Sequence, residues 1–298
     1  MEGVFNLAKK NVYDYVTERI IKQLEEGTIP WQKPWKGGLP INYISRKPYR
    51  GINLTLLPYS GEYLTFKQAK KLGATLKEGE SKNWHMVTFF KFNDYKKEVV
   101  NKKGEKEIKI KTYPILRYYK VYHIDSFDGL ESKLDVSEHD PIESAEEILN
   151  RYSEVPIYHK DNRAYYQPKN DVINVPKKEL FETIEEYYST AFHEMVHSTG
   201  HEERLDRFTN TDQFQFGSES YSFEELVAEL GSSMLCGIAG IEDVTIDNSA
   251  SYIKGWLSKL KNDKHLIVKA SSQAQKACDY IQNLSSQQNI KEVNENVA

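Results

Sequence analysis

The stretch Tyr187–Leu205 reads YYSTAFHEMVHSTGHEERL and places two histidines, His193 and His197, four residues apart. Side chains at that spacing lie on one face of an α-helix, so both imidazoles can reach a single metal ion. Glu194 directly follows the first histidine, where its carboxylate approaches a coordinated water rather than the metal. Apolar residues around this trio provide a face for burial, and Gly200 is typical of a helix end. The stretch therefore predicts a buried helix that binds a divalent ion.

This spacing is that of the zincin hydrolases. Zinc lowers the pKa of its water, a glutamate takes the proton, and the hydroxide attacks a carbonyl. We therefore expect Zn²⁺ as cofactor (with another divalent metal as the alternative), Glu194 as general base, and a protein or peptide as substrate. The segment Asp171–Pro176, upstream of the helix, is expected to be an edge strand that can pair with such a peptide.

A catalytic zinc needs a third protein ligand. The segment Tyr221–Gly231 reads as a helix on which Glu225 and Glu229 are four residues apart among apolar side chains. Two carboxylates in that setting are costly unless something pairs them, so we expect Glu225 to bind the metal and Glu229 to accept the second N–H of a ligand histidine. Glu229 itself and Glu203 stay open as the third ligand. The competing interpretation is a solvated acidic edge, with Glu224 and Glu225 both pointing outward.

The two halves of the chain differ in charge. Residues 1–125 carry 24 Lys and Arg against 13 Asp and Glu, whereas residues 126–298 carry 16 against 31. A basic half suggests a polyanionic partner. Single-stranded nucleic acid is bound by basic grooves together with aromatic faces on which bases stack. Aromatic residues are also common in cores, but the mixture near the N-terminus favours nucleic-acid contact by the following side chains: Trp31, Lys33, Trp35, Arg46, Tyr49 and Arg50.

The fold class expected from these patterns is α+β with two domains. A small basic α+β domain is expected over residues 1–125, followed by an acidic linker with Gly and Pro over residues 126–141. A mostly helical domain with a small sheet, which contains the predicted metal site, is expected over residues 142–285. Residues 286–298 are polar and are expected to be a flexible tail.

Two segments of the basic half, Trp84–Phe92 and Ile115–Ile124, have the aromatic and β-branched content of strands. The Lys- and Glu-rich residues between them are expected to form a hairpin or a flexible excursion. No apolar run approaches the roughly 20 residues that cross a bilayer, and the start does not read as a signal peptide. Cys236 and Cys278 are expected to be reduced core thiols. We therefore expect a cytoplasmic protein with no membrane partner.

Several strings along nearly the whole chain resemble the ArdC-type antirestriction proteins of conjugative plasmids and phages. They are PWQKPW at 30–35, PYRGIN at 48–53, LTFKQA at 64–69, HEMVHSTGH at 193–201 and FEELVAELG at 223–231. The resemblance implies an N-terminal domain that binds single-stranded DNA, joined to a zincin-like metallopeptidase domain. It also implies that the protein shields incoming DNA from host restriction.

Two other functions stay open at this point. One is a regulatory metalloprotease that is recruited to DNA and cleaves a host repressor or defence protein. The other is a DNA-coating protein whose metal only stabilises the second domain.

Overall fold

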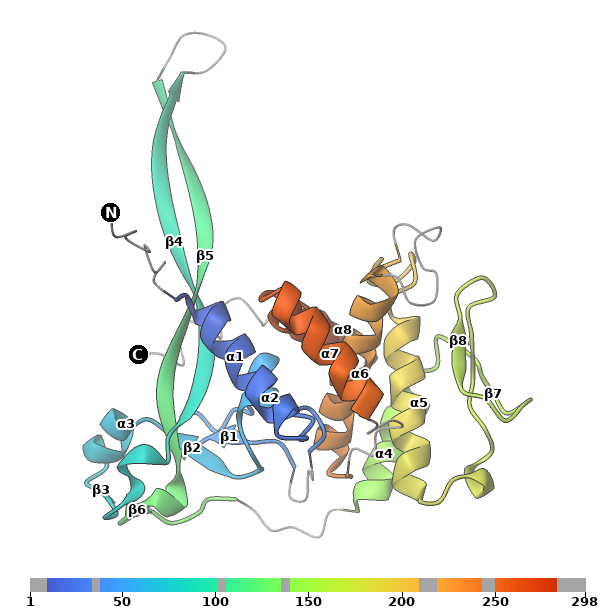
Figure 1. Cartoon of the computed structure of the whole chain (residues 1–298), viewed down its shortest axis with the longest axis horizontal. Coiled ribbons are helices and arrows are strands. Elements are labelled where there is room, and N and C mark those ends of the chain that lie inside the picture. The colour runs from blue at the N-terminus through green and yellow to red at the C-terminus, as the bar shows by residue number, and fades with distance from the viewer. Residues whose placement is uncertain are drawn as a thin grey trace, which may run out of the picture.

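The computed structural model describes residues 10–33, 38–100, 106–134, 140–208, 219–242 and 250–282. A helical body carries a long two-stranded arm that projects from it (Figure 1). The first half contains α1 (Val12–Glu25), β1 (Ile41–Asn42), α2 (Ile52–Leu56), β2 (Glu62–Leu64), α3 (Phe66–Lys71), β3 (Thr75–Leu76), β4 (His85–Val100), β5 (Lys106–His123) and β6 (Phe127–Asp128). The second half contains α4 (Pro141–Arg151), β7 (Ile157–Tyr158), β8 (Tyr165–Gln167), β9 (Val172–Asn174), α5 (Ile184–Ser198), α6 (Glu219–Ala239), α7 (Ala250–Asn262) and α8 (Leu266–Ile281). The expected α+β class is confirmed.

Helix α1 begins at a capping box, in which Asn11 and Asp14 each bond the other's backbone N–H. It ends before Gly27, whose φ of +79° is a left-handed conformation that glycine adopts without strain. Its buried stripe includes Ile20 and Leu24, and the helix packs along α7 (Figure 1). An N-terminal helix therefore rests on an element of the second half.

The main sheet of the first half has the strand order β1-β2-β5-β4. The two segments expected to be strands lie in β4 and β5, which form one long antiparallel hairpin. The Lys- and Glu-rich stretch between them continues these strands as the projecting arm (Figure 1). Of the two expectations for this stretch, a hairpin or a flexible excursion, its described part therefore forms the hairpin.

In the second half, α5 and α6 pack against each other, and α8 packs on α6. The two helices α5 and α6 approach closely at Gly231, where an added Cβ would lie 2.7 Å from Cγ2 of Val196. A glycine at this point lets the face of α5 that carries the histidines lie against α6. A hydrogen bond also joins the two helices, because the Ser232 hydroxyl of α6 donates to the backbone oxygen of Ser189 of α5 at 2.7 Å.

The small sheet beside α5 has the order β7-β9-β8. Strand β9 contains the segment expected to be an edge strand, but it pairs with β7 in parallel and with β8 in antiparallel register. That expectation was wrong, because both sides of β9 are already hydrogen-bonded. A strand with neighbours on both sides has no free backbone groups with which to bind a peptide.

One hydrophobic core runs through both halves, with Ile20 and Trp31 in the same cluster as Phe192, Leu226 and Trp256. Polar contacts cross between the halves as well: the Thr17 hydroxyl donates to the backbone oxygen of Lys264 at 2.7 Å. The two halves are therefore packed together over a shared apolar interface.

The expected linker at residues 126–141 begins inside folded structure. Phe127 is 3% exposed and pairs with Leu76 in the sheet of β3 and β6. The backbone N–H of Lys133 donates to the Glu62 carboxylate at 3.0 Å. Residues 135–139 and the expected tail at 286–298 lie outside the described residues. Within the described ranges, none of the helices combines the length and the apolar character needed to span a membrane.

Candidate metal centre

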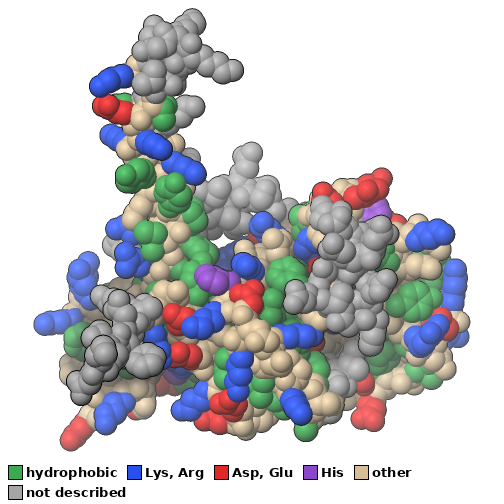
Figure 2. Space-filling model, turned by 45° about the horizontal axis from the view of Figure 1, so that its top comes forward, with side chains coloured by type: hydrophobic (Ala, Val, Ile, Leu, Met, Phe, Trp, Pro, Cys, Tyr) green, Lys and Arg blue, Asp and Glu red, His purple; other side chains and the backbone are tan. Residues whose placement is uncertain are grey.

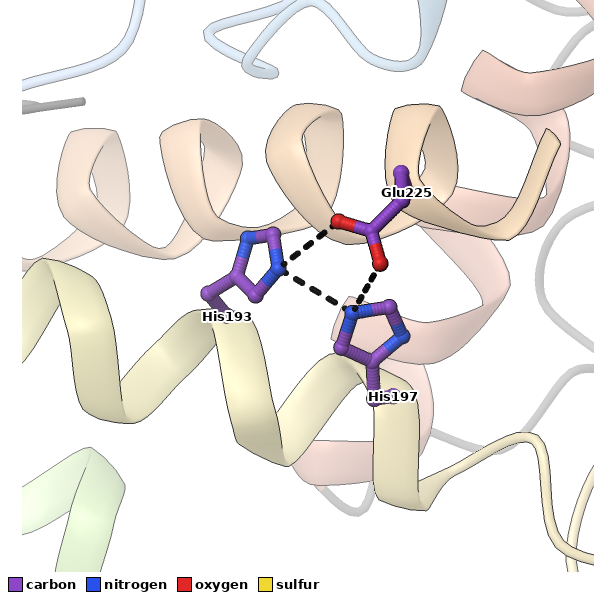
Figure 3. A group of neighbouring side chains, drawn as sticks. All are labelled: His193, His197 and Glu225. Atoms are coloured by element: carbon purple, nitrogen blue, oxygen red, sulfur yellow. Dashed lines mark hydrogen bonds and ion pairs between the residues drawn. The ribbon is translucent and has the colours of Figure 1, made fainter. Parts of the chain in front are cut away.

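The two histidines of the HEMVH string lie on one face of α5. Thr183 caps the N-terminus of this helix, because its hydroxyl accepts the backbone N–H of Glu186, and acidic residues lie in the first turn. His193 and His197 fall near its C-terminal end, and their Nε2 atoms are 3.0 Å apart. Both imidazoles point toward α6 (Figure 3). The helix thus places the two imidazoles side by side with the i, i+4 geometry expected from the sequence.

Glu225 of α6 completes a group of three. Its Oε2 atom is 3.6 Å from Nε2 of His193, and its Oε1 atom is 3.6 Å from Nε2 of His197 (Figure 3). The three ligand atoms all lie within 4.8 Å of one another. Ligands of a tetrahedral zinc ion are separated by about 3.3 Å, given metal–ligand bonds of about 2.0–2.1 Å. The residues present therefore fit a divalent ion with two nitrogen donors and one oxygen donor.

The electrostatics of the trio favour a cation. Burial alone would lower the pKa of His193, but the hydrogen bond to Glu225 and the nearby carboxylates raise it to about 9. Burial works against the ionised form of Glu225, yet His193 and His197 hold the pKa of this carboxyl at about 2. The group therefore keeps an ionised carboxylate and attracts positive charge, whether from a proton or from a metal ion.

Glu194 and Tyr221 lie beside this group. Glu194 is 7% exposed, although it is a charged residue in a helix of mainly apolar surroundings. The Tyr221 phenol has a raised pKa, because it is partly buried and faces the charges of Glu225 and Glu194. A phenol in that state stays protonated and can donate a hydrogen bond. The site thus holds a carboxylate that can accept a proton and a hydroxyl that can donate a hydrogen bond.

Sequence reasoning missed the partner of His197. Nδ1 of His197 is 3.6 Å from Oε1 of Glu224, whose side chain is 4% exposed. Arg207 donates to the Glu224 carboxylate from Nε at 3.0 Å and from Nη2 at 2.6 Å. Arg207 also donates to the backbone oxygen of Val196 at 2.7 Å, which ties it to α5. Glu224 is therefore a buried carboxylate paired with Arg207 and next to the ring of His197, and the interpretation of Glu224 as part of a solvated edge was wrong.

Glu229 was expected to take that role. Its Oε2 atom accepts a hydrogen bond from Nε1 of Trp31 at 2.8 Å and another from the hydroxyl of Tyr252. Burial raises the pKa of Glu229, and the Tyr252 and Trp31 hydrogen bonds oppose that rise. The carboxylate still acts on His193 through its charge. Glu229 therefore joins the metal group to the N-terminal half, a connection that only the packing of the two halves creates.

The alternative third ligand, Glu203, is exposed in the turn that follows α5. Its backbone N–H donates to the ring of His201 at 3.3 Å. Among the described residues that can hold a metal ion together, the group consists of His193, His197 and Glu225. The geometry favours Glu225 over both alternatives.

The residues expected to contact nucleic acid are mostly engaged inside the protein. Trp31 is 1% exposed and Tyr49 is 8% exposed, so neither ring has a face free for stacking. The Trp31 ring packs edge-on against Trp256, with ring centres 6.1 Å apart. The burial of these rings supports the alternative interpretation of the sequence analysis, in which they belong to the core. Trp35 lies outside the described residues.

The three cations of the same set differ in their surroundings. Arg46 forms an ion pair with Glu62 and donates to the backbone oxygen of Lys133 at 2.9 Å. Nη2 of Arg50 contacts both oxygens of the Asp279 carboxylate at 2.6 Å. Lys33 is 7% exposed, and burial lowers its pKa to about 8. Both arginines therefore serve internal pairs, one of which joins the first half to α8.

Comparison with known proteins matches both halves. Residues 10–122 match a family model described as the N-terminal domain of anti-restriction factor ArdC. Residues 143–273 match a model of a zincin-like metallopeptidase. The crystal structure of metal-free antirestriction ArdC protein from plasmid R388 is 34% identical and has a TM-score of 0.70, covering 93% of this chain and 99% of that one. Its Mn(II)-bound structure is 32% identical, has a TM-score of 0.69, and covers 94% of this chain and all of that one (100%).

Similar protein sequences also match over nearly the whole of this chain. Two proteins from Escherichia coli, each named DNA primase TraC, are 33% identical over 92% of this chain. The matched part spans only 20% of one primase and 27% of the other. The uncharacterized protein y4eC of Sinorhizobium fredii (strain NBRC 101917 / NGR234) is 30% identical, with 91% of each chain covered.

Proposed function

The chain belongs to the ArdC-type antirestriction family, and from that membership we propose that it binds single-stranded DNA entering a cell and protects it from host restriction. The observation that carries this proposal is the presence of both family regions in one chain, with the metal group intact at the position of the zincin helix. The place of action is the cytoplasm, where incoming DNA meets restriction enzymes.

The second half is proposed to hold one divalent ion through His193, His197 and Glu225. Two imidazoles and a carboxylate suit zinc, and they also suit other first-row divalent metals. The Mn(II)-bound structure of the R388 relative supports a divalent ion at such a site. A bound ion supplies Lewis acidity, which polarises a carbonyl and lowers the pKa of a water. Zinc is the ion that the donor set favours most in hydrolases of this kind.

The residues of the chain have separate tasks in the proposed hydrolysis. The buried carboxylate of Glu194 accepts a proton from the attacking water. The protonated phenol of Tyr221 donates a hydrogen bond to the oxygen that gains negative charge. Glu224, held by Arg207, fixes the ring of His197 in its orientation. The substrate is proposed to be a protein or peptide.

Antirestriction is tested by conjugating an unmodified plasmid, which enters as a single strand, into recipients that express the protein. We expect more transconjugants in a recipient with an active restriction enzyme, and no change in an isogenic recipient without the enzyme. Equal recovery with and without the protein in the restricting recipient would overturn the proposed function. Expression of the protein is checked by immunoblot in both recipients.

The role of Glu194 is tested with Glu194→Gln, which removes the proton acceptor and leaves the three metal-binding side chains in place. We expect the variant to bind as much metal as the wild type, measured by elemental analysis, and to lose hydrolysis. Proteomes of cells expressing the two forms are then compared. A host protein that disappears only with the wild type would favour the second candidate function, a DNA-recruited regulatory metalloprotease.

The non-enzymatic alternative, in which the metal only stabilises the fold, makes a different prediction. In that case Glu194→Gln protects DNA as well as the wild type does. The variant His193→Ala, which removes a metal-binding side chain, would in that case lower both the melting temperature and the protection. Buried Glu194 favours the hydrolytic role, because an ionisable side chain is costly in that place without a function or a partner.

A further inference from the structure

The arm formed by β4 and β5 has two distinct faces. All 16 residues of β4 pair with β5 in one unbroken register, from His85 opposite Val121 to Val100 opposite Lys106. Directly paired residues of an antiparallel hairpin point to the same side, and successive residues alternate between sides. The odd-numbered residues of β4 and their partners therefore share one face. From Lys91 outward the arm extends by about 30 Å, at about 3.3 Å per residue.

One of these faces, here called the basic aromatic face, combines cations with exposed rings. Register places Lys91 opposite Ile115, and Tyr95 opposite Lys111. Tyr95 is 64% exposed and Tyr113 is 46% exposed. Among the described side chains at positions 87–97 and 111–119, this face has no Asp or Glu. Its cations and its most exposed rings are Lys91, Tyr95, Lys97, Lys111, Tyr113 and Arg117.

The opposite face of the arm has another composition. It carries Asp94 and Glu98, each with a partner on the same face: the Thr112 hydroxyl donates to Asp94 at 2.6 Å, and Lys106 lies 3.6 Å from Glu98. Beside them lie exposed apolar side chains, which are the aliphatic Ile108 and Ile110 and the rings of Phe92 and Tyr118. The two sides of one hairpin therefore separate a face of positive charge from a face of mixed charge, which carries Lys96 and Lys120 as well as the two carboxylates. Figure 2 shows Lys and Arg side chains next to hydrophobic ones along the arm.

The basic aromatic face has the elements of a single-strand binding surface. The ammonium group of Lys111 lies 5.3 Å from the centre of the Tyr113 ring. A hollow on the arm is lined by Asn93, Tyr95, Tyr113 and Ile115 of this face, together with Phe92 and Asp94 of the opposite face. Bases of a single strand stack on such rings while neighbouring cations bind the phosphates, and this mode works without sequence readout. Duplex DNA hides its base faces, so such a surface favours single strands.

A cluster of cations at the foot of the arm adds to this charge. Burial, with smaller effects of the nearby Arg19, His123 and Lys33, lowers the pKa of His85, the first residue of β4, to about 4. Within the described part of the chain, neither Arg19 nor Lys33 has a carboxylate partner, and Nδ1 of His85 is buried without a hydrogen bond. Uncompensated positive charge of this kind attracts anions such as phosphodiesters.

We propose that the basic aromatic face of the β4–β5 arm is the surface on which the protein holds single-stranded DNA, with bases on Tyr95 and Tyr113 and phosphates on the lysines. This inference rests on the proposed function and gives it a location. It replaces the region around Trp31, whose aromatic rings are buried, as the place where bases stack.

The charge of the face is tested with Lys91→Glu/Lys111→Glu in the full-length protein. Fluorescence anisotropy follows a labelled single strand of about 20 nucleotides, longer than the roughly 4–16 nucleotides that one small binding domain covers. We expect at least a tenfold weaker affinity and a shallower salt dependence, by about 0.7 in log–log slope for each phosphate that the variant no longer neutralises. The matched control is Lys96→Glu/Lys106→Glu, which makes the same charge change on the opposite face and is expected to weaken binding less than threefold or so, through long-range charge alone.

The rings are tested separately with Tyr95→Ser/Tyr113→Ser against Ile108→Ser/Ile110→Ser. Both pairs replace exposed side chains of the arm, and circular dichroism checks that each variant is folded. We expect the tyrosine pair to lose about tenfold or more in affinity for the single strand, with an unchanged salt slope, because stacking releases no counterions. The isoleucine pair is expected to bind like the wild type.

The outcomes separate this inference from the function on which it rests. If the wild type fails to bind single-stranded DNA, the proposed function and this inference both fall. If the wild type binds and the variants of the basic aromatic face bind equally well, only the arm assignment is overturned. If the arm serves protein association instead, Tyr95→Ser/Tyr113→Ser should convert a dimeric protein into a monomer, as measured by light scattering. The affinity for DNA should then stay unchanged.

Discussion

Two regions of this protein carry the same mixture of aromatic and basic residues, and they lie in opposite environments. In the first region, Trp31 and Tyr49 are buried, and Trp31 and Arg50 contact residues of the second half. The β4–β5 arm leaves the body of the protein, and Tyr95 and Tyr113 are exposed on it. Composition alone favours nucleic-acid binding in both regions to the same degree. Exposure is what separates a stacking surface from a core.

The difference has a physical origin in what each segment can pair with. The first segment lies beside α6, α7 and α8, which offer apolar surface for Trp31 and a carboxylate, Asp279, for Arg50. Among the described elements, none packs on the arm beyond the body (Figure 1), and Tyr95, Tyr113 and Ile108 are exposed there. Aromatic residues with a partner layer become core, whereas those on an isolated hairpin stay available for a ligand.

The largest effect that separates the two regions is expected on stability. Trp31→Ala removes a side chain that is 1% exposed and takes one hydrogen-bond donor away from Glu229, so we expect the free energy of unfolding to fall by about 3–5 kcal/mol. Tyr95→Ala is expected to change it by less than about 0.5 kcal/mol. Urea denaturation at neutral pH measures both. Similar losses for the two variants would contradict the contrast between core and surface.

A smaller effect is expected from the ion pairs of the two regions. Arg50→Ala leaves Asp279, which is 8% exposed at its side chain, without its cation, and should cost about 2–3 kcal/mol of unfolding free energy. The control is Lys106→Ala in the arm, where the pair with Glu98 is 80% and 69% exposed and should contribute about 0–0.5 kcal/mol. A cost below about 0.5 kcal/mol for Arg50→Ala would mean that this pair does not hold the halves together.

The smallest effect is expected to depend on pH. Although burial opposes ionisation, the hydrogen bonds from Arg46, Ser132 and the backbone of Lys133 hold the pKa of Glu62 below its ordinary value of 4.5. The ionised carboxylate therefore stabilises the fold above about pH 4.5, and this contribution is lost as the pH falls through the lowered pKa. We expect Glu62→Gln to lose about 1–2 kcal/mol at neutral pH, and the gap to the wild type to shrink below about pH 4.5. Denaturant unfolding across that pH range provides the check, and a gap that widens toward acid would show that the sign is wrong.

The metal group was predictable because most of it depends on local geometry. His193 and His197 meet through the helix repeat alone, which any folded helix provides. Glu225 was found by an argument about cost, since a carboxylate on an otherwise apolar helix requires a partner. The basic half was visible in its charge, and the hairpin was visible in its strand composition. These features involve residues that are close in sequence or extreme in composition.

The partners of the metal-binding side chains were not predictable in the same way. Glu224 and Glu229 both lie on α6, and the rotation of that helix against α5 decides which of them meets His197. Gly231 sets this packing through its close approach to Val196, which is a distance between helices. Arg207 and Trp31 reach the two carboxylates from other parts of the chain. No spacing rule connects Trp31 to Glu229, 198 residues away.

The sequence by itself therefore determined the elements of this protein: the helix of the candidate metal site, the proposed general base on it, the carboxylate opposite, the charge of each half and the two strands of the arm. The tertiary structure alone decided which aromatic and basic residues are buried, which carboxylate orients His197, and that β9 lies in the centre of its sheet. The physical reason is that local geometry follows from the backbone repeat, whereas burial and pairing depend on which distant surfaces come together. The same residue types form core in one place and an exposed surface in another because solvent reaches only the second.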